Sequence, residues 1–215
     1  MIKMIRKWTL WLLSPLYCFS AQWDEGTSSN LFIKYKINED FFMTSRNNIV
    51  SRDFADDFFF GYTDFNLGYK FSKNGSFELG YRFAKLKLPS GMRKKHRPLL
   101  NLSFSTSKKN WFLMNRHRIE WRNFEGSTPT RERYRNETRI LFPYKFMDRF
   151  RPYAEQEFFY EFNGTGYNEN WLTSGISFKV NKEIGFKIGY RWQSRKVQKD
   201  WKNRHLLVTG CSIVF

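Results

Sequence analysis

The chain has 215 residues, of which 27% are charged and 20% aromatic, with a formal net charge of +17 and a mean hydropathy of −0.63. This length suits a single domain, and two cysteines, Cys18 and Cys211, are too few for a disulfide framework. No stretch after residue 21 is long and apolar enough to form a membrane-spanning helix. A basic, aromatic-rich chain also fits nucleic-acid binding, but no binding motif is present and we expect no nucleic-acid partner.

The first 21 residues have the pattern of a secretory signal peptide. A basic start (Lys3, Arg6 and Lys7) precedes an apolar stretch, and small residues follow before the cleavage point. The apolar stretch contains a proline and is shorter than the ~20 residues of a spanning helix, which disfavours an uncleaved anchor. We therefore expect a cleaved signal peptide, residues 1–21, and a mature domain, residues 22–215.

Alternating apolar and polar residues recur along the mature chain. In the first such segment Leu31, Ile33 and Tyr35 share one face, and Lys34 and Lys36 share the other. This period of two is the pattern of a strand with one apolar and one polar face. Ten segments have it: 30–43, 56–71, 76–86, 98–106, 111–124, 132–142, 151–162, 171–180, 184–192 and 204–215. The sequence predicts an all-β protein of about ten strands.

The connections between these segments alternate in length. Longer ones are predicted at 44–55, 87–97, 125–131, 163–170 and 194–203, and shorter ones at 72–75, 107–110, 143–150 and 181–182. Short periplasmic turns and longer extracellular loops are typical of antiparallel transmembrane β-barrels in the outer membrane. These barrels have an even number of strands, which places both termini on the periplasmic side. The high aromatic content favours the same fold, because these barrels carry aromatic girdles at both membrane interfaces. A soluble lipocalin-like barrel, with its apolar face inside, is the structural alternative.

The last strand carries a second indication of an outer-membrane barrel. Cys211, Ile213 and Phe215 fall on one face, and Gly210 and Val214 fall on the other. A terminal apolar strand would leave an unprotected sheet edge unless it pairs with the first strand of a closed barrel. We expect Gly210, Ile213 and Phe215 to form a C-terminal signal for the barrel-assembly machinery.

Charged residues repeat with period two in three consecutive segments. They are Arg116, Arg118, Glu120 and Arg122 in the first, Arg133, Arg135, Glu137 and Arg139 in the second, and Glu155 and Glu157 in the third. Antiparallel pairing would bring these acids and guanidinium groups together inside the barrel. Two interpretations follow: a packed network that fills a narrow lumen, or a net-positive path that guides an anion.

These three segments read NRHRIEWR, RYRNETR and PYAEQEFFY. The pattern resembles an uncharacterised, DUF-type family of bacterial outer-membrane barrels, in which an Asn-Arg-x-Arg-x-Glu-x-Arg strand is followed by an Arg-x-Arg strand and a Pro-Tyr-x-x-x-Glu-x-Phe-Tyr strand. The resemblance implies a barrel in the outer membrane. It carries over no catalytic residue, because the family has no established activity.

An enzyme would need a histidine near an acid or a serine at the rim of the barrel. His96 lies in a predicted basic loop (93–97), His117 is expected to face outward, and only His205, close to Asp200 in the sequence, is a plausible catalytic candidate. No His or Cys cluster has the spacing of metal ligands, and we expect no cofactor.

The expected role is that of an envelope structural or interaction protein with a charge-filled lumen. A narrow anion-preferring channel is the main alternative, and an outer-membrane hydrolase or lipid A-modifying enzyme is the third. Expected partners are the barrel-assembly machinery and outer-membrane lipids, because cationic loops would meet the phosphates of lipopolysaccharide. The oligomeric state is left open.

Overall fold

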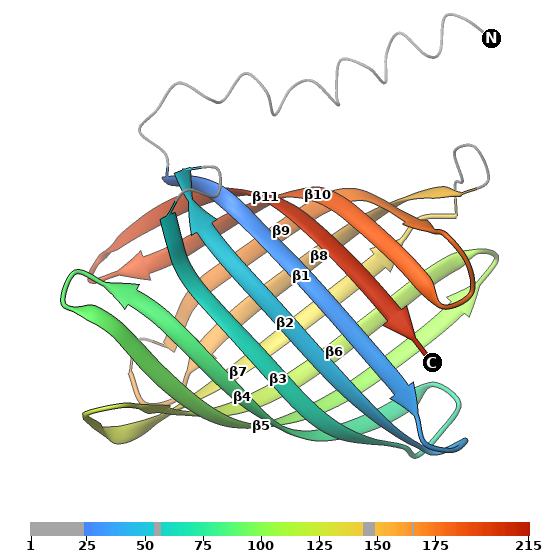
Figure 1. Cartoon of the computed structure of the whole chain (residues 1–215), viewed down its shortest axis with the longest axis horizontal. Coiled ribbons are helices and arrows are strands. Elements are labelled where there is room, and N and C mark those ends of the chain that lie inside the picture. The colour runs from blue at the N-terminus through green and yellow to red at the C-terminus, as the bar shows by residue number, and fades with distance from the viewer. Residues whose placement is uncertain (1–23, 54–56, 144–148, 165) are drawn as a thin grey trace, which may run out of the picture.

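The computed structural model describes residues 24–53, 57–143, 149–164 and 166–215, and these residues form eleven strands that close into one barrel (Figure 1). The strands are β1 (Asp24–Lys36), β2 (Phe41–Arg52), β3 (Asp57–Lys70), β4 (Gly75–Leu88), β5 (Gly91–Lys108), β6 (Trp111–Phe124), β7 (Ser127–Leu141), β8 (Phe150–Glu161), β9 (Gly166–Lys179), β10 (Ile184–Val197) and β11 (Asp200–Val214). Within this part of the chain no helix is long and apolar enough to cross a membrane. The predicted signal peptide lies outside the described residues.

The eleventh strand comes from the start of the barrel. The predicted first strand, 30–43, is in fact a hairpin: β1 ends at Lys36, β2 begins at Phe41, and these strands pair from Lys36 opposite Phe42. The side chain of Asn38 shapes the turn, because its Oδ1 accepts hydrogen bonds from the backbone N–H groups of Asp40 (3.0 Å) and Phe41 (2.7 Å). The segment predicted as the loop 44–55 is mostly β2.

The odd number of strands makes the closing pair parallel. β1 and β11 run side by side in the same direction (Figure 1), with Asp24 opposite Arg204 and Lys34 opposite Val214. Phe215 completes the closure, since its N–H donates to the Lys34 carbonyl (2.9 Å) and its carbonyl accepts from the Lys36 N–H (3.1 Å). The expectation that both ends of the barrel chain lie on one side is therefore wrong. We call the two sides the Asp24 end and the Phe215 end.

The predicted long loops at the Asp24 end are also wrong. The connections there are short: 53–56, 89–90, 125–126, 162–165 and 198–199. The supposed basic loop 93–97 belongs to β5, and most of 194–203 belongs to β10 and β11. The inner face of these strands is polar, so charged residues fit within the strands. A run of charged residues is therefore not an indication of a loop in this barrel.

The barrel is apolar outside and polar inside. Leu67, Leu79 and Ile188 are among many large apolar side chains exposed on the outer face, whereas most buried side chains are polar or charged. The buried apolar residues of the described chain are Phe42, Val50, Ala84, Leu99, Tyr153, Phe159, Leu206 and Val208. This orientation is the reverse of that in a soluble barrel, which keeps its apolar face inside.

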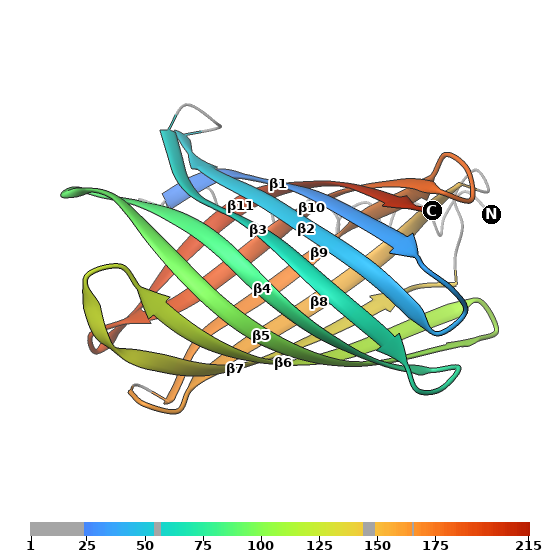
Figure 2. The same cartoon turned by 60° about the horizontal axis from the view of Figure 1, so that its bottom comes forward.

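Aromatic pairs lie near both ends of the outer face. Those toward the Phe215 end are Trp111–Phe142, Phe41–Tyr69 and Phe71–Phe104, and those toward the Asp24 end are Tyr167–Trp201 and Tyr160–Phe162. The strands between these bands are strongly tilted (Figure 2). We start at Lys36, at the Phe215 end of β1, and move to the paired residue on each next strand. One circuit of the barrel then ends at Lys202 on β11, which lies beside Arg204, the partner of Asp24 at the opposite end of β1. This stagger brings side chains of non-adjacent strands to the same height in the lumen.

Candidate functional site

One side of the lumen is filled by a buried group of charges. We call this group, which β3 to β7 contribute, the packed cluster: Asp64, Arg82, Arg97, Arg118, Glu120 and Arg133. Glu120 is its centre and is 0% exposed. Its carboxylate oxygens lie 2.7 Å from Arg133 Nη2, 3.4 Å from Arg97 Nη1, 3.4 Å from Arg118 Nη1 and 3.8 Å from Arg82 Nη1.

A second carboxylate completes the packed cluster. Asp64 accepts two hydrogen bonds from Arg82, one from Nε and one from Nη2 (2.7 Å). This two-point contact is the strongest geometry for a guanidinium and a carboxylate. Arg82 also stacks on the ring of Tyr62, with 3.7 Å between Cζ and the ring centroid. The pairing offsets the cost of burying these charges, so this side of the lumen is a structural core made of ions.

A second group of charges adjoins the packed cluster on β6 and β7 and continues onto β8 and β10. We call it the open cluster, and all its members line the cavity described below: Arg116, Arg135, Glu137, Arg139, Glu155, Glu157, Lys187 and Arg191. Arg139 Nε lies 2.6 Å and Lys187 Nζ 3.0 Å from Glu155 Oε1, while Arg116 pairs with Glu137 and Arg135 with Glu157. The cluster holds five cations and three carboxylates. The side chains of Arg139 and Lys187 are 33% and 23% exposed, so this group meets solvent inside the barrel.

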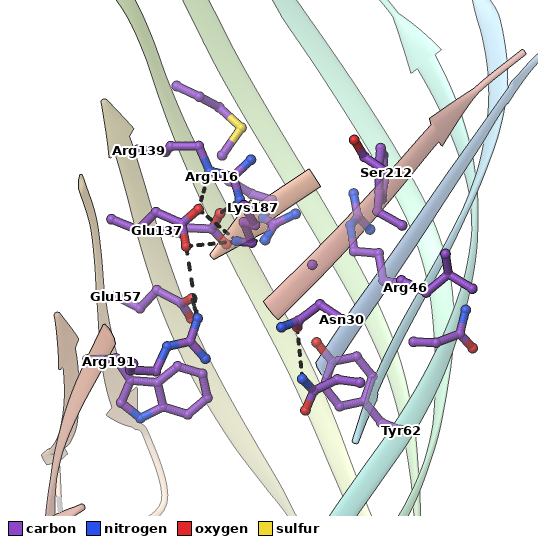
Figure 3. A pocket seen from close by; sticks show the side chains of 18 of the residues that line it. Asn30, Arg46, Tyr62, Arg116, Glu137, Arg139, Glu157, Lys187, Arg191 and Ser212 are labelled. Carbon is purple, nitrogen blue, oxygen red and sulfur yellow. Dashed lines mark hydrogen bonds and ion pairs between the residues drawn. The ribbon is translucent and has the colours of Figure 1, made fainter. Parts of the chain in front are cut away.

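A single cavity of about 1800 Å³ runs beside the open cluster. Its lining includes Lys34 and Glu183 from the Phe215 end, and Arg52 and Arg204 from the Asp24 end. Figure 3 shows six members of the open cluster, among them Glu137 and Arg191, on one side of this space, and Arg46 with Asn30, Tyr62 and Ser212 on the other. The cavity therefore extends along the lumen toward both ends of the barrel, and its lining carries more arginine and lysine than acid.

Small residues keep this space open. Gly185, Gly210 and Ser212, on β10 and β11, line the cavity. At Gly210 a Cβ atom would lie only 2.8 Å from Lys187 Cγ, so the absent side chain makes room for the stem of that lysine. The cavity is therefore lined by large charged side chains of the open cluster and by small residues of β10 and β11.

The structure places all ten predicted lumen charges on the inner face. Arg118, Glu120 and Arg133 lie in the packed cluster, and Arg122 pairs with Glu161 nearer the Asp24 end. The other six belong to the open cluster. Charges that the sequence did not connect with this network are Arg46, Asp64, Glu78, Arg82, Arg97, Lys187 and Arg191. Alternation already turned Asp64 and Arg82 inward, but the sequence held no information on how far the strands are staggered.

The three histidines lie on the outer face of the strands. His205 is five residues into β11 and stacks on Tyr190, whose hydroxyl is hydrogen-bonded to its Nδ1. His117 Nδ1 pairs with the Tyr134 hydroxyl (2.6 Å), and His96 lies on β5. Among the residues that the structure describes, no three His, Cys, Asp or Glu side chains are grouped as a metal site would require.

The proposed C-terminal signal has two faces. Gly210 faces the lumen under Lys187, while Ile213 lies on the outer face, opposite Ile33 of β1 and Ile184 of β10. Phe215 has an exposed ring and a backbone that closes the barrel. Recognition of these residues by the assembly machinery stays a prediction.

A closed barrel with an apolar exterior and a polar, partly open lumen is a porin-like fold. The chain belongs to DUF2490, a family of proteins of unknown function whose model matches residues 26–204, and the expected resemblance to an uncharacterised barrel family is confirmed. A solved structure described as the NanC porin is 12% identical, with a TM-score of 0.52, over 86% of this chain and 98% of that chain. At this identity the likeness establishes the fold alone. No curated protein matches the sequence.

Proposed function

We propose that the protein is an outer-membrane channel that prefers small anions. The observation that carries this proposal is the cavity of about 1800 Å³, which residues from both ends of the barrel line with an excess of cations. A narrow polar passage between low-dielectric walls concentrates the field of its lining charges. Arg46, Lys187 and Arg191 therefore attract anions into the passage and repel cations.

Placement in the outer membrane is supported by the outer face. Its exposed apolar belt would bury well in lipid, and its aromatic pairs near both ends suit the two interfaces. Lys85, Lys87 and Lys94 are exposed near the Asp24 end and support contact with lipid phosphates there, where Lys87 also faces Asp57 and Lys94 faces Glu125. The test is the gel mobility of the protein from purified outer membranes, before and after boiling in detergent. A faster unheated form supports the placement, and a soluble periplasmic protein of unchanged mobility contradicts it.

Conduction is tested by single-channel recording with two matched variants. Lys187→Gln removes a lumen charge and Lys94→Gln removes a charge from the outer face, where its side chain is 60% exposed. We expect Lys187→Gln to lower the ratio of anion to cation permeability at least twofold and Lys94→Gln to leave it unchanged. Equal effects of the two variants would contradict a selective passage.

A structural role without conduction is the second candidate. It is favoured by the packed cluster, in which Asp64 and Glu120 are fully buried and fill part of the lumen. A folded, membrane-inserted barrel that shows no conductance would establish this candidate in place of the channel.

A further inference from the structure

A third group of basic side chains lies in the lumen toward the Asp24 end. We call it the vestibule cluster: Lys95, Arg97, Arg122, Arg133 and Arg195, from strands β5, β6, β7 and β10, all of which line the cavity. Arg97 and Arg133 are shared with the packed cluster through Glu120. The vestibule cluster therefore stands where a solute entering from the Asp24 end would pass.

Lys95 has no acidic partner in this cluster. Its ammonium lies 4.9 Å from the ring centroid of Phe124, and among the described residues no carboxylate is within ion-pair distance of it. The charged neighbours that act most strongly on Lys95 are the four arginines of the vestibule cluster. Cations from strands β5, β6, β7 and β10 thus surround a lysine that has no carboxylate partner among the described residues.

Two buried donors in the same cluster are also unused. Arg97 is 4% exposed and Arg122 is 5% exposed, yet the Nε atom of each has no hydrogen-bond partner among the described residues. Buried N–H groups normally have a partner in the protein or in ordered water, so these two donors are available to a ligand in the cavity. Three acids pair with arginines of this cluster, Glu120, Glu161 and Glu169, and they leave its five cations with a surplus of positive charge.

We propose that the vestibule cluster binds a doubly charged oxyanion, such as the phosphate group of an entering solute. The proposal rests on the proposed channel function and names the kind of solute that the passage takes. Guanidinium groups match the oxygens of an oxyanion through paired N–H donors, while Lys95 supplies a point charge. A chloride ion would neutralise less of the surplus and would use fewer of the donors.

The first test is block of chloride current by inorganic phosphate and by glycerol phosphate in planar bilayers. Millimolar amounts of either compound should reduce the single-channel current, and Lys95→Gln should raise the half-blocking concentration about tenfold. Lys179→Gln is the matched control, because it removes a charge that lines the cavity near the Phe215 end. An unchanged half-blocking concentration in Lys95→Gln, or an equal change in Lys179→Gln, overturns the site. Block by inorganic phosphate alone would restrict the ligand to the free ion.

A second test does not depend on conduction. Purified barrel in detergent, added to a phosphate solution, should broaden the ³¹P resonance, and Lys95→Gln should remove most of the broadening while Lys179→Gln keeps it. Broadening by a non-conducting protein would support the anion site while contradicting the channel. Conduction without broadening or block would contradict the site and leave the channel standing.

Discussion

Arg118 and Arg135 lie directly opposite each other on β6 and β7, although both carry a positive charge. The two side chains turn apart: Arg118 contacts Glu120, and Arg135 pairs with Glu157. This divergence separates the packed cluster, which fills one part of the lumen, from the open cluster, which lines the cavity. Variants at Asp64 and Glu120 therefore test the stability of the barrel, and variants at Lys187 test the proposed channel.

Glu120→Gln should strongly destabilise the barrel. The change keeps the shape of the side chain but leaves four buried arginines without their shared charge, and breaking a buried ion pair costs about 3–5 kcal/mol. The urea midpoint of unfolding in detergent, followed by tryptophan fluorescence, measures the effect. Glu183→Gln, in an exposed connection, is the control and should keep the wild-type midpoint. A normal midpoint for Glu120→Gln would contradict the structural role of the packed cluster.

Asp64 and Arg82 should be energetically coupled. Their two-point contact is buried, so Asp64→Asn and Arg82→Gln should each destabilise the barrel, and the double variant should lose less than the sum of the two. We expect a coupling free energy of about 1–3 kcal/mol from a double-mutant cycle in urea. Additive losses would show that the contact contributes nothing specific.

Two glycines should respond differently to alanine. At Gly175 a Cβ atom would lie 2.2 Å from the backbone oxygen of Ile188, which cannot move without breaking the β9–β10 ladder. At Gly210 the obstacle is the flexible side chain of Lys187. Gly175→Ala should therefore reduce the amount of folded barrel, whereas Gly210→Ala should fold and change the single-channel current. The unheated gel band measures folding, and the reverse order of effects would contradict the described packing.

Alternation along the sequence was sufficient to assign the two faces of most strands. It turned Leu31 and Tyr35 outward and Arg118 and Glu120 inward, because a strand has no other side-chain period. The hairpin at 37–40 was missed for the same reason. Lys36 is opposite Phe42, so residues of odd number face outward on both β1 and β2. The alternation of apolar and polar residues therefore continues across the turn without a change of phase. The polar run Asn38-Glu39-Asp40 was the signal that could have located it.

The contacts inside the lumen could not be predicted to the same extent. Arg82 reaches Glu120 across β5, and Arg191 on β10 approaches Glu155 on β8 across β9. Such contacts depend on the stagger of tilted strands, which a one-residue change of register would alter. The sequence alone therefore indicates which charges face inward. Without the register of the strands it does not indicate which of these charges pair.

Removal of Phe215 should impair barrel formation. The residue closes the barrel through hydrogen bonds to Lys34 and Lys36, and its exposed ring is part of the proposed assembly signal. We expect most of the truncated protein to be absent from purified outer membranes or to lack a heat-modifiable band. Cys211→Ala, a small change on the outer face of the same strand, should assemble normally. Normal assembly of the truncated chain would contradict this role.

The reversal potential of the wild-type channel tests the central claim most directly. Purified protein in a planar bilayer, under a tenfold gradient of KCl, should give a steady conductance whose zero-current voltage has the sign of the chloride equilibrium potential. The cationic excess around the cavity predicts that sign. A zero-current voltage on the potassium side, or an inserted barrel that passes no current, would contradict the account.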